Sequence, residues 1–209
     1  MNIGIVGYQG DVAEHVELIE RMNDEYKREV SVLLVRSVKA LSLVSGLIIP
    51  GGESTTIYRL IKEFGLFDAM KTRIGEGLPV MGTCAGLILI SREIPGERVR
   101  TLNVLDVNVK RNAYGRQGDS FVDEIDIEGI GSFNAVFIRA PIIERWGNVL
   151  VLAKHGGSPV MVRDGNILGL TFHPELTEDP RVHELFMDMI GSGGYPSTAT
   201  RDIPMIEYV

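Results

Sequence analysis

Short apolar runs alternate with amphipathic stretches through the first half of the chain. Residues 2–7 predict a buried strand, and apolar residues at helical spacing over 11–22 predict a helix with Asp11 as its N-cap. Further strands are expected at 30–35, 46–50 and 78–82, and further helices are expected to begin near Ser54 and at Ala85. This alternation is typical of a parallel sheet that is covered by helices on both faces.

The second half has a different pattern, in which apolar runs follow one another with short turns between them. Asp164-Gly165-Asn166 lies between two such runs and predicts a hairpin. The expected strands lie at 102–110, 119–127, 133–139, 149–154, 160–164 and 167–172, and a closing helix lies at 180–190. The pattern predicts a three-layer α/β fold with a mostly parallel central sheet and extra antiparallel strands. We expect a single domain over 1–190 and a tail at 191–209.

Composition narrows the class of protein. The 209 residues are 44% hydrophobic and carry a formal net charge of −7, so we expect neither a nucleic-acid partner nor a polybasic membrane anchor. The one cysteine excludes an internal disulfide and a cysteine-based zinc cluster, and it fits a reducing compartment. No targeting segment and no apolar stretch of membrane-spanning length is visible, so we expect a cytoplasmic protein.

The strongest candidate for chemistry is the pattern G-x-C-x-G at 82–86, between an expected strand and an expected helix. A tight strand-to-helix turn of this form presents a nucleophile, and a helix N-terminus favours a thiolate there. The N–H of Ala85 would face the same space and could bind an oxyanion. The alternative is that Cys84 is a small buried residue beside packing glycines, but the strand–turn–helix context favours the nucleophile.

A second candidate, His173-Pro174-Glu175, follows the expected strand 167–172. Pro174 biases His173 towards an extended backbone, in which residues two apart point to the same side. Glu175 could therefore orient the His173 ring, and a thiol, an imidazole and a carboxylate would form a catalytic set. The alternative is a histidine and a glutamate in a surface loop.

Gly51 and Gly52 follow an expected strand and precede an expected helix, so their N–H groups could hold an anion or an oxyanion. The lysine of a P-loop is missing, which makes nucleotide binding a weak hypothesis. Ser54 as a simple helix N-cap is the alternative interpretation of this segment.

Arg111 and Arg139 each end an expected strand. Either could bind a substrate carboxylate, although a solvated charge is the default interpretation. His15, His155 and His183 lack metal-ligand spacing, and we interpret them as structural or solvated residues. No metal and no cofactor is expected.

The motifs PGGES at 50–54, GTCAGL at 82–87 and FHPE at 172–175 together resemble the class I, or triad, glutamine amidotransferases. Longer stretches narrow the resemblance to one branch, the glutaminase subunits of pyridoxal 5′-phosphate synthase. These stretches are GYQGDVAEH at 7–15, KRNAYGRQ at 110–117, FIRAP at 137–141 and FHPELTED at 172–179. The resemblance runs from about residue 1 to residue 190 and implies a flavodoxin-like fold, in agreement with the pattern of strands and helices.

The resemblance implies that L-glutamine is hydrolysed to L-glutamate and ammonia through a thioester. It implies a triad of Cys84, His173 and Glu175. We expect the oxyanion hole in the N–H groups of Ala85 and of the loop containing Gly51 and Gly52. The resemblance also implies glutamine contacts at Gly52, Glu53, Ser54, Arg111, Ile138 and Arg139.

The resemblance further implies a partner, a separate synthase subunit that receives the ammonia and builds pyridoxal phosphate, a form of vitamin B6. The segment around Gln9 and Gly10 would lie near this partner. Free ammonia is mostly protonated near neutral pH, so a channel to the partner would keep it nucleophilic. We hypothesise that the glutaminase is weak alone and is switched on when it docks.

Three alternatives remain. Cys84 could be the nucleophile of a redox sensor or a peptidase of similar architecture, although PGGES and the His-Pro-Glu run argue against this. The chain could be a non-catalytic binding module that has kept the fold, although its residue types suit a complete triad. It could also serve another synthase, such as one making histidine or a nucleotide, against which GYQGD, RNAYGRQ and HPELTED argue.

Overall fold

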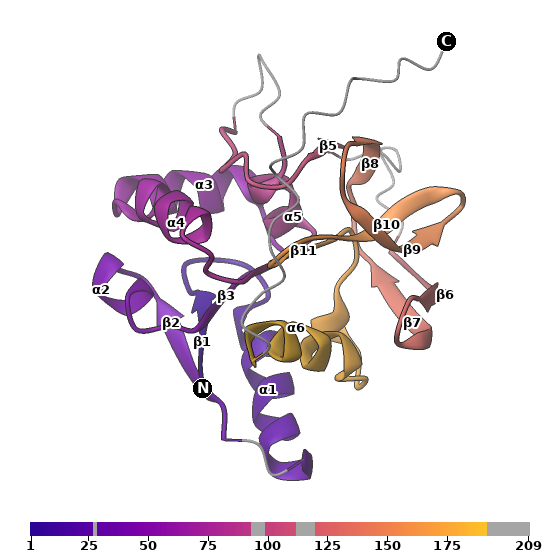
Figure 1. Ribbon diagram of the computed structural model, residues 1–209, viewed down its shortest axis with the longest axis horizontal. Helices are drawn as coiled ribbons and strands as arrows, with labels where there is room; N and C mark the ends of the chain where they lie inside the picture. The colour runs from indigo at the N-terminus through magenta and orange to yellow at the C-terminus, as the bar shows by residue number, and fades with distance from the viewer. Residues whose placement is uncertain (27–28, 93–98, 112–119, 192–209) are drawn as a thin grey trace.

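A sheet of nine strands forms the frame of the computed structural model, which describes residues 1–26, 29–92, 99–111 and 120–191 (Figure 1). The strand order is β2-β1-β3-β4-β11-β10-β9-β6-β7. Within these residue ranges, no helix combines the length and the apolar character that crossing a bilayer requires.

The first five strands of that order are parallel. They are β2 (Ser31–Val35), β1 (Asn2–Val6), β3 (Gly46–Ile49), β4 (Val80–Thr83) and β11 (Ile167–Leu170). Every residue of β3 and β4 is buried, because helices cover both faces of the sheet there. Burial on both faces explains why these strands appear in the sequence as continuous apolar runs without alternation.

The remaining strands extend the sheet in antiparallel fashion. They are β10 (Ser158–Asp164), β9 (Leu150–His155), β6 (Phe121–Ile127) and β7 (Gly131–Phe137). Asp164 of β10 pairs with Ile167 of β11 across a two-residue turn, which confirms the predicted hairpin. A separate antiparallel pair joins β5 (Val107–Lys110) to β8 (Ile142–Trp146).

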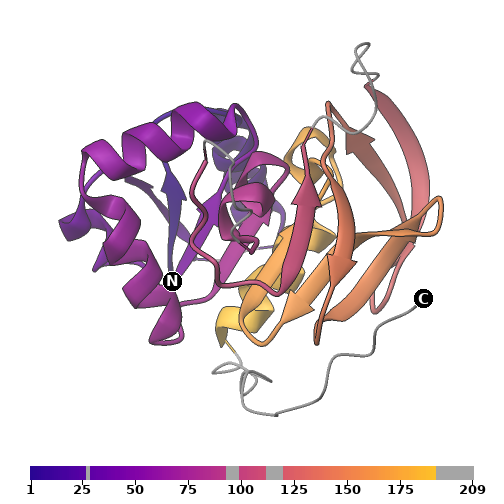
Figure 2. The ribbon, with the colours of Figure 1, turned by 90° about the horizontal axis from the view of Figure 1, so that it is seen from above.

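Helices lie on both faces of the parallel half (Figure 1). One face carries α3 (Ser54–Glu63), α4 (Leu66–Gly75) and α5 (Ala85–Ile90), and the other carries α1 (Val12–Tyr26) and α6 (Arg181–Gly191). Two apolar cores follow from this layering. Ile57, Met70 and Leu87 belong to the first, and Ile19 and Phe186 belong to the second. Figure 2 shows the antiparallel strands to one side of this layered half.

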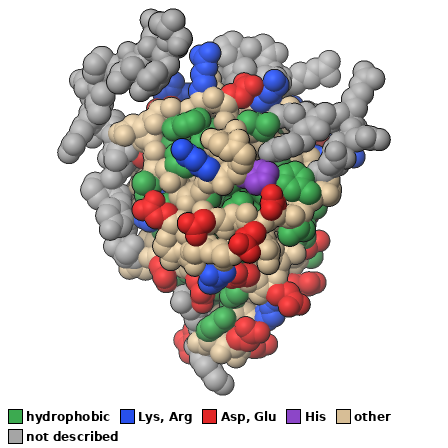
Figure 3. Space-filling model, turned by 90° about the vertical axis from the view of Figure 1, so that its right-hand side faces the viewer, with side chains coloured by type: hydrophobic (Ala, Val, Ile, Leu, Met, Phe, Trp, Pro, Cys, Tyr) green, Lys and Arg blue, Asp and Glu red, His purple; other side chains and the backbone are tan. Residues whose placement is uncertain are grey.

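The side of the molecule formed by the antiparallel strands is rich in acidic side chains (Figure 3). In β6, Asp123, Glu124 and Asp126 are exposed while Ile125 and Ile127 are buried. Such a surface repels phosphate groups, so this face is unsuited to binding nucleic acid.

The predicted three-layer α/β fold is confirmed, although the ends of several elements differ by a few residues. Three elements were not predicted as separate elements from the sequence: β8, the short helix α2 (Val38–Leu41) and α4. The predicted tail at 191–209 lies outside the described residues except for Gly191. Most of the KRNAYGRQ motif also lies outside the described residues, which resume at 120.

The parallel strands bring the sequence motifs to one edge of the sheet. The carboxyl ends of β1, β3, β4 and β11 are followed by Gln9, Gly51, Cys84 and His173, respectively. Strands β3, β4 and β11 are in register, since Ile49 pairs with Gly82 and Thr83 pairs with Leu170. In open parallel sheets this edge is where ligands bind.

Candidate active site

Cys84 occupies the turn between β4 and α5. Its backbone has φ 46° and ψ −97°, a conformation that strains a residue with a side chain. Its N–H donates to the carbonyl of Leu170 in β11 over 2.9 Å, which ties the turn to the next strand. The thiol is buried and donates to the carbonyl of Ile138, with 3.8 Å between sulfur and oxygen. The sulfur is therefore held in place at the start of α5.

The two glycines of the G-x-C-x-G pattern allow this turn to pack. A Cβ atom at Gly82 would lie 2.7 Å from the backbone of Gly86, and one at Gly86 would overlap the carbonyl of Ile49 in β3. Close approach of backbone to backbone is therefore the reason for both glycines. The prediction that glycines flank the cysteine for packing is consistent with these contacts.

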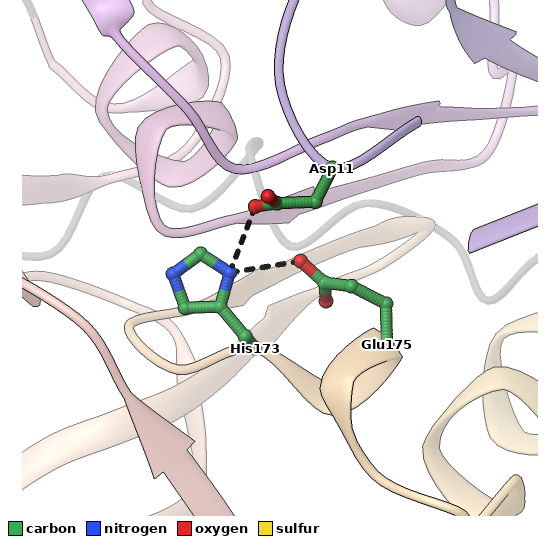
Figure 4. A group of neighbouring side chains, drawn as sticks. All are labelled: Asp11, His173 and Glu175. Atoms are coloured by element: carbon green, nitrogen blue, oxygen red, sulfur yellow. Dashed lines mark hydrogen bonds and ion pairs between the residues drawn. The ribbon is translucent and has the colours of Figure 1, made fainter. Parts of the chain in front are cut away.

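His173 is held between two carboxylates (Figure 4). Its Nδ1 atom lies 2.9 Å from Oε1 of Glu175 and 3.2 Å from Oδ2 of Asp11. Glu175 is the second residue of the short 3-10 helix η1 (Pro174–Leu176), and its side chain is fully buried. Asp11 comes from the loop after β1, so the ring is fixed from two distant parts of the chain.

These contacts govern the charge of the His173 ring. Burial opposes its protonation, but hydrogen bonds to Asp11, Cys84 and Glu175 outweigh burial and raise the pKa of His173 to about 12. Burial also raises the pKa of Glu175, and the hydrogen bond from His173 works against that rise. The ring is therefore protonated at neutral pH, with Nδ1–H directed at the carboxylates. Its Nε2 atom has no hydrogen-bond partner of good geometry among the described residues.

A second layer of polar groups lies behind Glu175. Nε2 of His15 is 3.6 Å from Oε2 of Glu175, and Nδ1 of His15 is 2.9 Å from Nε2 of His183. The hydroxyl of Thr83 lies 3.5 Å from both Glu175 Oε1 and His15 Nε2. Burial lowers the pKa of His15 well below 6.5, with repulsion from His183 and His173 adding to it, and burial lowers the pKa of His183 to about 3. Both rings are therefore neutral.

The loop after β3 is packed against the His173 ring. Its Gly51 carbonyl accepts the N–H of Asp11 at 3.3 Å, and a Cβ atom at Gly51 would overlap the His173 ring and the Asp11 carboxylate. The N–H of Glu53 donates to Oε1 of Gln9 over 2.9 Å. The loops after β1 and β3 are thus joined directly behind the imidazole.

The N-cap of α3 differs from the sequence interpretation. Glu53 is the capping residue, since its carboxylate accepts the N–H groups of Thr55 and Thr56. Ser54 is instead the first residue of the helix and is buried. The interpretation of Ser54 as a simple N-cap is therefore wrong, because the longer glutamate side chain reaches back to the free N–H groups.

Of the other predicted site residues, Ile138 contacts the thiol directly, and Arg111 contacts the start of α3. Arg111 follows β5 and lies 3.4 Å from Oε1 of Glu53 and 3.3 Å from the hydroxyl of Thr55. Ile138 offers its carbonyl to Cys84, and the next residue, Arg139, has φ 45° and an exposed side chain. Ala85 begins α5, where an N–H group has no partner within the helix.

Asp11, His173 and Glu175 each place one ligand-type atom within 4.8 Å of the others. Both carboxylates lie at hydrogen-bond distance from the same Nδ1 atom of His173. A ring N–H between two carboxylates accounts for that geometry, and we assign no metal to this group.

Sequence reasoning missed the roles of three residues in this arrangement. Asp11 directly precedes α1 and its carbonyl accepts the N–H of His15, as an N-cap does, but its carboxylate also contacts His173. The interpretation of His15 and His183 as structural or solvated did not foresee that His15 lies against Glu175 and that His183 lies against His15. His155, in contrast, pairs with Asp123 at 2.8 Å, away from this site.

The match to a family of known proteins covers nearly the whole chain. The model of the SNO glutamine amidotransferase family matches residues 5–192. The chain belongs to the SNO glutamine amidotransferase family. Among relatives named pyridoxal 5′-phosphate synthase subunit PdxT, that of Thermoplasma volcanium is 56% identical over 96% of this chain and 100% of its own length. That of Thermosipho africanus is 48% identical over 91% of this chain and 99% of its own length.

Solved structures agree with membership of the SNO family. A structure described as a glutamine amidotransferase superposes with a TM-score of 0.82 at 45% identity, covering 90% of this chain and 98% of that chain. The structure of PurLQS from Thermotoga maritima superposes with a TM-score of 0.57 at 15% identity, covering 92% and 95%. The second likeness concerns the fold alone.

Proposed function

We propose that this chain is the glutaminase subunit of a pyridoxal 5′-phosphate synthase and hydrolyses L-glutamine to L-glutamate and ammonia. The observation that carries the proposal is the meeting of Cys84, His173 and Glu175 at one edge of the sheet. The thiol is among the groups that favour a protonated His173, and Glu175 holds the opposite ring nitrogen. A nucleophile, a base and an orienting carboxylate in this order suit acyl transfer.

In the proposed reaction the thiolate of Cys84 attacks the carboxamide carbon of glutamine. The carbon–nitrogen bond breaks while protonated His173 gives a proton to the departing nitrogen, which leaves as ammonia, and a thioester remains on the sulfur. His173 then takes a proton from water, which attacks the thioester and releases glutamate. Nε2 of His173 suits both transfers because Nδ1 is occupied by the carboxylates.

The charged tetrahedral oxygen needs N–H donors. Ala85 supplies one at the start of α5, and the loop containing Gly51 and Gly52 supplies others. Removing one such donor typically costs about 10²–10³-fold in rate. Hydrolysis of an amide through a thioester needs no cofactor, because the sulfur and the imidazole carry the bond changes.

The remaining residues are assigned to substrate binding. Glu53 and Arg111 have opposite charges 3.4 Å apart, and such a pair suits the ammonium and carboxylate groups of an amino acid. Backbone groups of Gly52 and Ile138 and the side chains of Ser54 and Arg139 complete the proposed contacts. Polar groups that pair only with the carboxamide would select glutamine over glutamate.

The partner is the synthase subunit that consumes the ammonia, and the proposed location of the complex is the cytoplasm. A surface groove lined by Tyr8, Gln9, Gly10 and Val16 lies beside the joined loops, which supports docking near Gln9. The side chain of Gln9 accepts the N–H of Glu53, so a partner that moves Gln9 would also act on the backbone of Glu53. This connection gives docking a direct route to the glutamine site.

Ammonia release from glutamine tests the proposal. The chain is assayed alone, with a synthase subunit from the same source, and with Cys84→Ser in both settings. Release that needs the partner and vanishes in Cys84→Ser is the expected result. Ammonia release without partner dependence would contradict the docking requirement. No ammonia release in any setting would refute the proposed glutaminase activity.

A further inference from the structure

Two buried histidines that the proposed reaction does not use lie directly behind its carboxylate. His15 of α1 and His183 of α6 are both fully buried, although they are 168 positions apart in the sequence. Their facing nitrogen atoms, Nδ1 of His15 and Nε2 of His183, are 2.9 Å apart. The other nitrogen of His15 faces Oε2 of Glu175 at 3.6 Å. Burying two imidazoles is costly unless their hydrogen bonds are matched.

The positions of the protons follow from the neighbours. One proton lies between the two rings, so either His15 or His183 donates it. If His15 donates at Nδ1, its Nε2 lone pair faces the Glu175 carboxylate, and His183 keeps a buried Nδ1–H without a partner among the described residues. If His183 donates, the Nε2–H of His15 faces the carboxylate, and only a lone pair of His183 is left unpaired. The second arrangement avoids both the repulsion and the unpaired donor.

Thr83 fits the same direction of donation. Its hydroxyl lies 3.5 Å from Oε1 of Glu175 and 3.5 Å from Nε2 of His15, so it can donate to the carboxylate while it accepts from the imidazole. Donors then converge on Glu175 from His173 and Thr83, with His15 beside Oε2. Oε2 of Glu175 has no hydrogen-bond partner in the described part of the chain, and Nε2 of His15 faces it at 3.6 Å.

We infer that His15 is a positioning residue for the proposed glutaminase: His15 orients Glu175 and keeps it ionised, and His183 holds His15 in the required tautomer. This inference rests on the proposed function, because Glu175 matters only if it supports His173 and Cys84. The charged and titratable groups that face this cluster are Asp11, Cys84 and His173, together with the two histidines themselves.

The pH dependence of Cys84 alkylation tests the inference. Cys84 is the one cysteine of the chain, so loss of free thiol during reaction with iodoacetamide reports this site alone. Without the His15 donor, Glu175 takes up a proton at higher pH, and His173 loses the partner that supports a thiolate. We therefore expect His15→Leu to move the acid limb of the alkylation rate upward by about one pH unit. His183→Leu should move it less, in the same direction.

Conservative variants separate positioning from packing. His15→Gln keeps an N–H donor near the position of Nε2 and should restore the wild-type limb, as His183→Gln should for its own site. Glutaminase assays of the complex formed by the two leucine variants should show a reduced kcat at acid pH with little change in KM, and the glutamine variants should match the wild type. Thermal unfolding of each variant identifies any loss of fold, and the two glutamine variants keep the test valid where a leucine variant fails to fold.

The outcomes distinguish the inference from the proposed function. An acid limb that is unchanged in a folded His15→Leu, or one that moves downward, would overturn the inference while active wild-type complex upholds the glutaminase. A downward shift would mean that Glu175 donates a proton to His15 instead. Failure of the wild-type complex to hydrolyse glutamine would overturn the proposed function, and the inference with it.

Discussion

The two sides of the candidate site differ in how they are held. On the inner side, His173, Glu175 and His15 are buried and contact one another. On the outer side, Glu53 and Arg111 have side chains that are 51% and 28% exposed and meet at 3.4 Å. Buried charges persist only with matched partners, whereas an exposed ion pair contributes little. The inner side is therefore built for chemistry, and the outer side is left open for a ligand.

Glu175→Gln changes the carboxylate at the centre of the inner side and should cause the largest loss of kcat. The amide keeps the shape but removes the charge and can present the wrong atom to Nδ1 of His173. Loss of an orienting carboxylate in a triad typically costs about 10⁴-fold in kcat. Steady-state glutaminase assays of the complex measure this loss of kcat. A loss below about tenfold would show that Asp11 alone suffices for His173.

Gly51→Ala disturbs the inner side from the loop. The added Cβ overlaps the His173 ring and the Asp11 carboxylate, so the ring must shift. A displacement of about 1 Å in a catalytic group can cost about 10²-fold in kcat. The matched control is Gly75→Ala at the end of α4, where a Cβ meets nothing within 4 Å. Equal activity of the two variants would contradict this account of the loop.

Acid should destabilise the chain through its buried histidines. The pKa of His183 is about 3 when folded and about 6.5 when unfolded, so the unfolded state binds the extra proton as pH falls below about 6.5. Stability from this group is complete above that pH and is lost progressively towards pH 3. At about pH 4.5 the expected loss is about 3 kcal/mol.

His183→Leu should reduce this acid sensitivity. Urea unfolding of the wild type and the variant at a series of pH values measures the slope of stability against pH. A slope that is the same in both would show that His183 is protonated in the folded chain.

Asp11→Asn should have a moderate effect. Asp11 is a second acceptor at Nδ1 of His173, at 3.2 Å against 2.9 Å for Glu175, and its side chain is 29% exposed. We expect a loss of about tenfold in kcat, because hydrogen bonds to charged groups contribute about 1.5–3 kcal/mol and this one is partly exposed to solvent. Asp24→Asn on the exposed surface of α1 is the control. No difference from that control would leave Glu175 as the only carboxylate that matters.

Arg111→Lys on the outer side should have the smallest effect. The exposed pair with Glu53 contributes at most about 1 kcal/mol, so stability should not change measurably. A lysine cannot bind a carboxylate with two parallel hydrogen bonds, so KM for glutamine should rise a few-fold while kcat stays the same. A fall in kcat equal to that of Asp11→Asn would remove the distinction between the two sides.

Much of the fold follows from local sequence pattern. Buried parallel strands such as β3 and β4 appear as short apolar runs, and the glycines of the G-x-C-x-G turn mark where backbones approach. The strand β8 was missed because only Ile143 within it is fully buried, so its pattern is weak. α2 was missed because a single turn of helix leaves little periodicity.

The candidate site shows the same division. Cys84, His173 and Glu175 stand in motifs whose chemistry is visible along the chain. The positions of Asp11, His15 and His183 become meaningful only when β1, α1 and α6 pack around η1. Local rules predict an N-cap for an aspartate before a helix and a structural or solvated role for a lone histidine. The contacts that give these residues a further role join residues more than 150 positions apart.

The mass of the chain during turnover tests the central claim most directly, namely that the buried inner side prepares Cys84 to form a thioester. The complex is mixed with glutamine, quenched in acid within the first turnovers, and digested for peptide mass analysis. We predict a glutamyl group on the peptide that contains Cys84, and none in Cys84→Ser. Ammonia release without such a modified peptide, or with the group on another residue, would contradict the account.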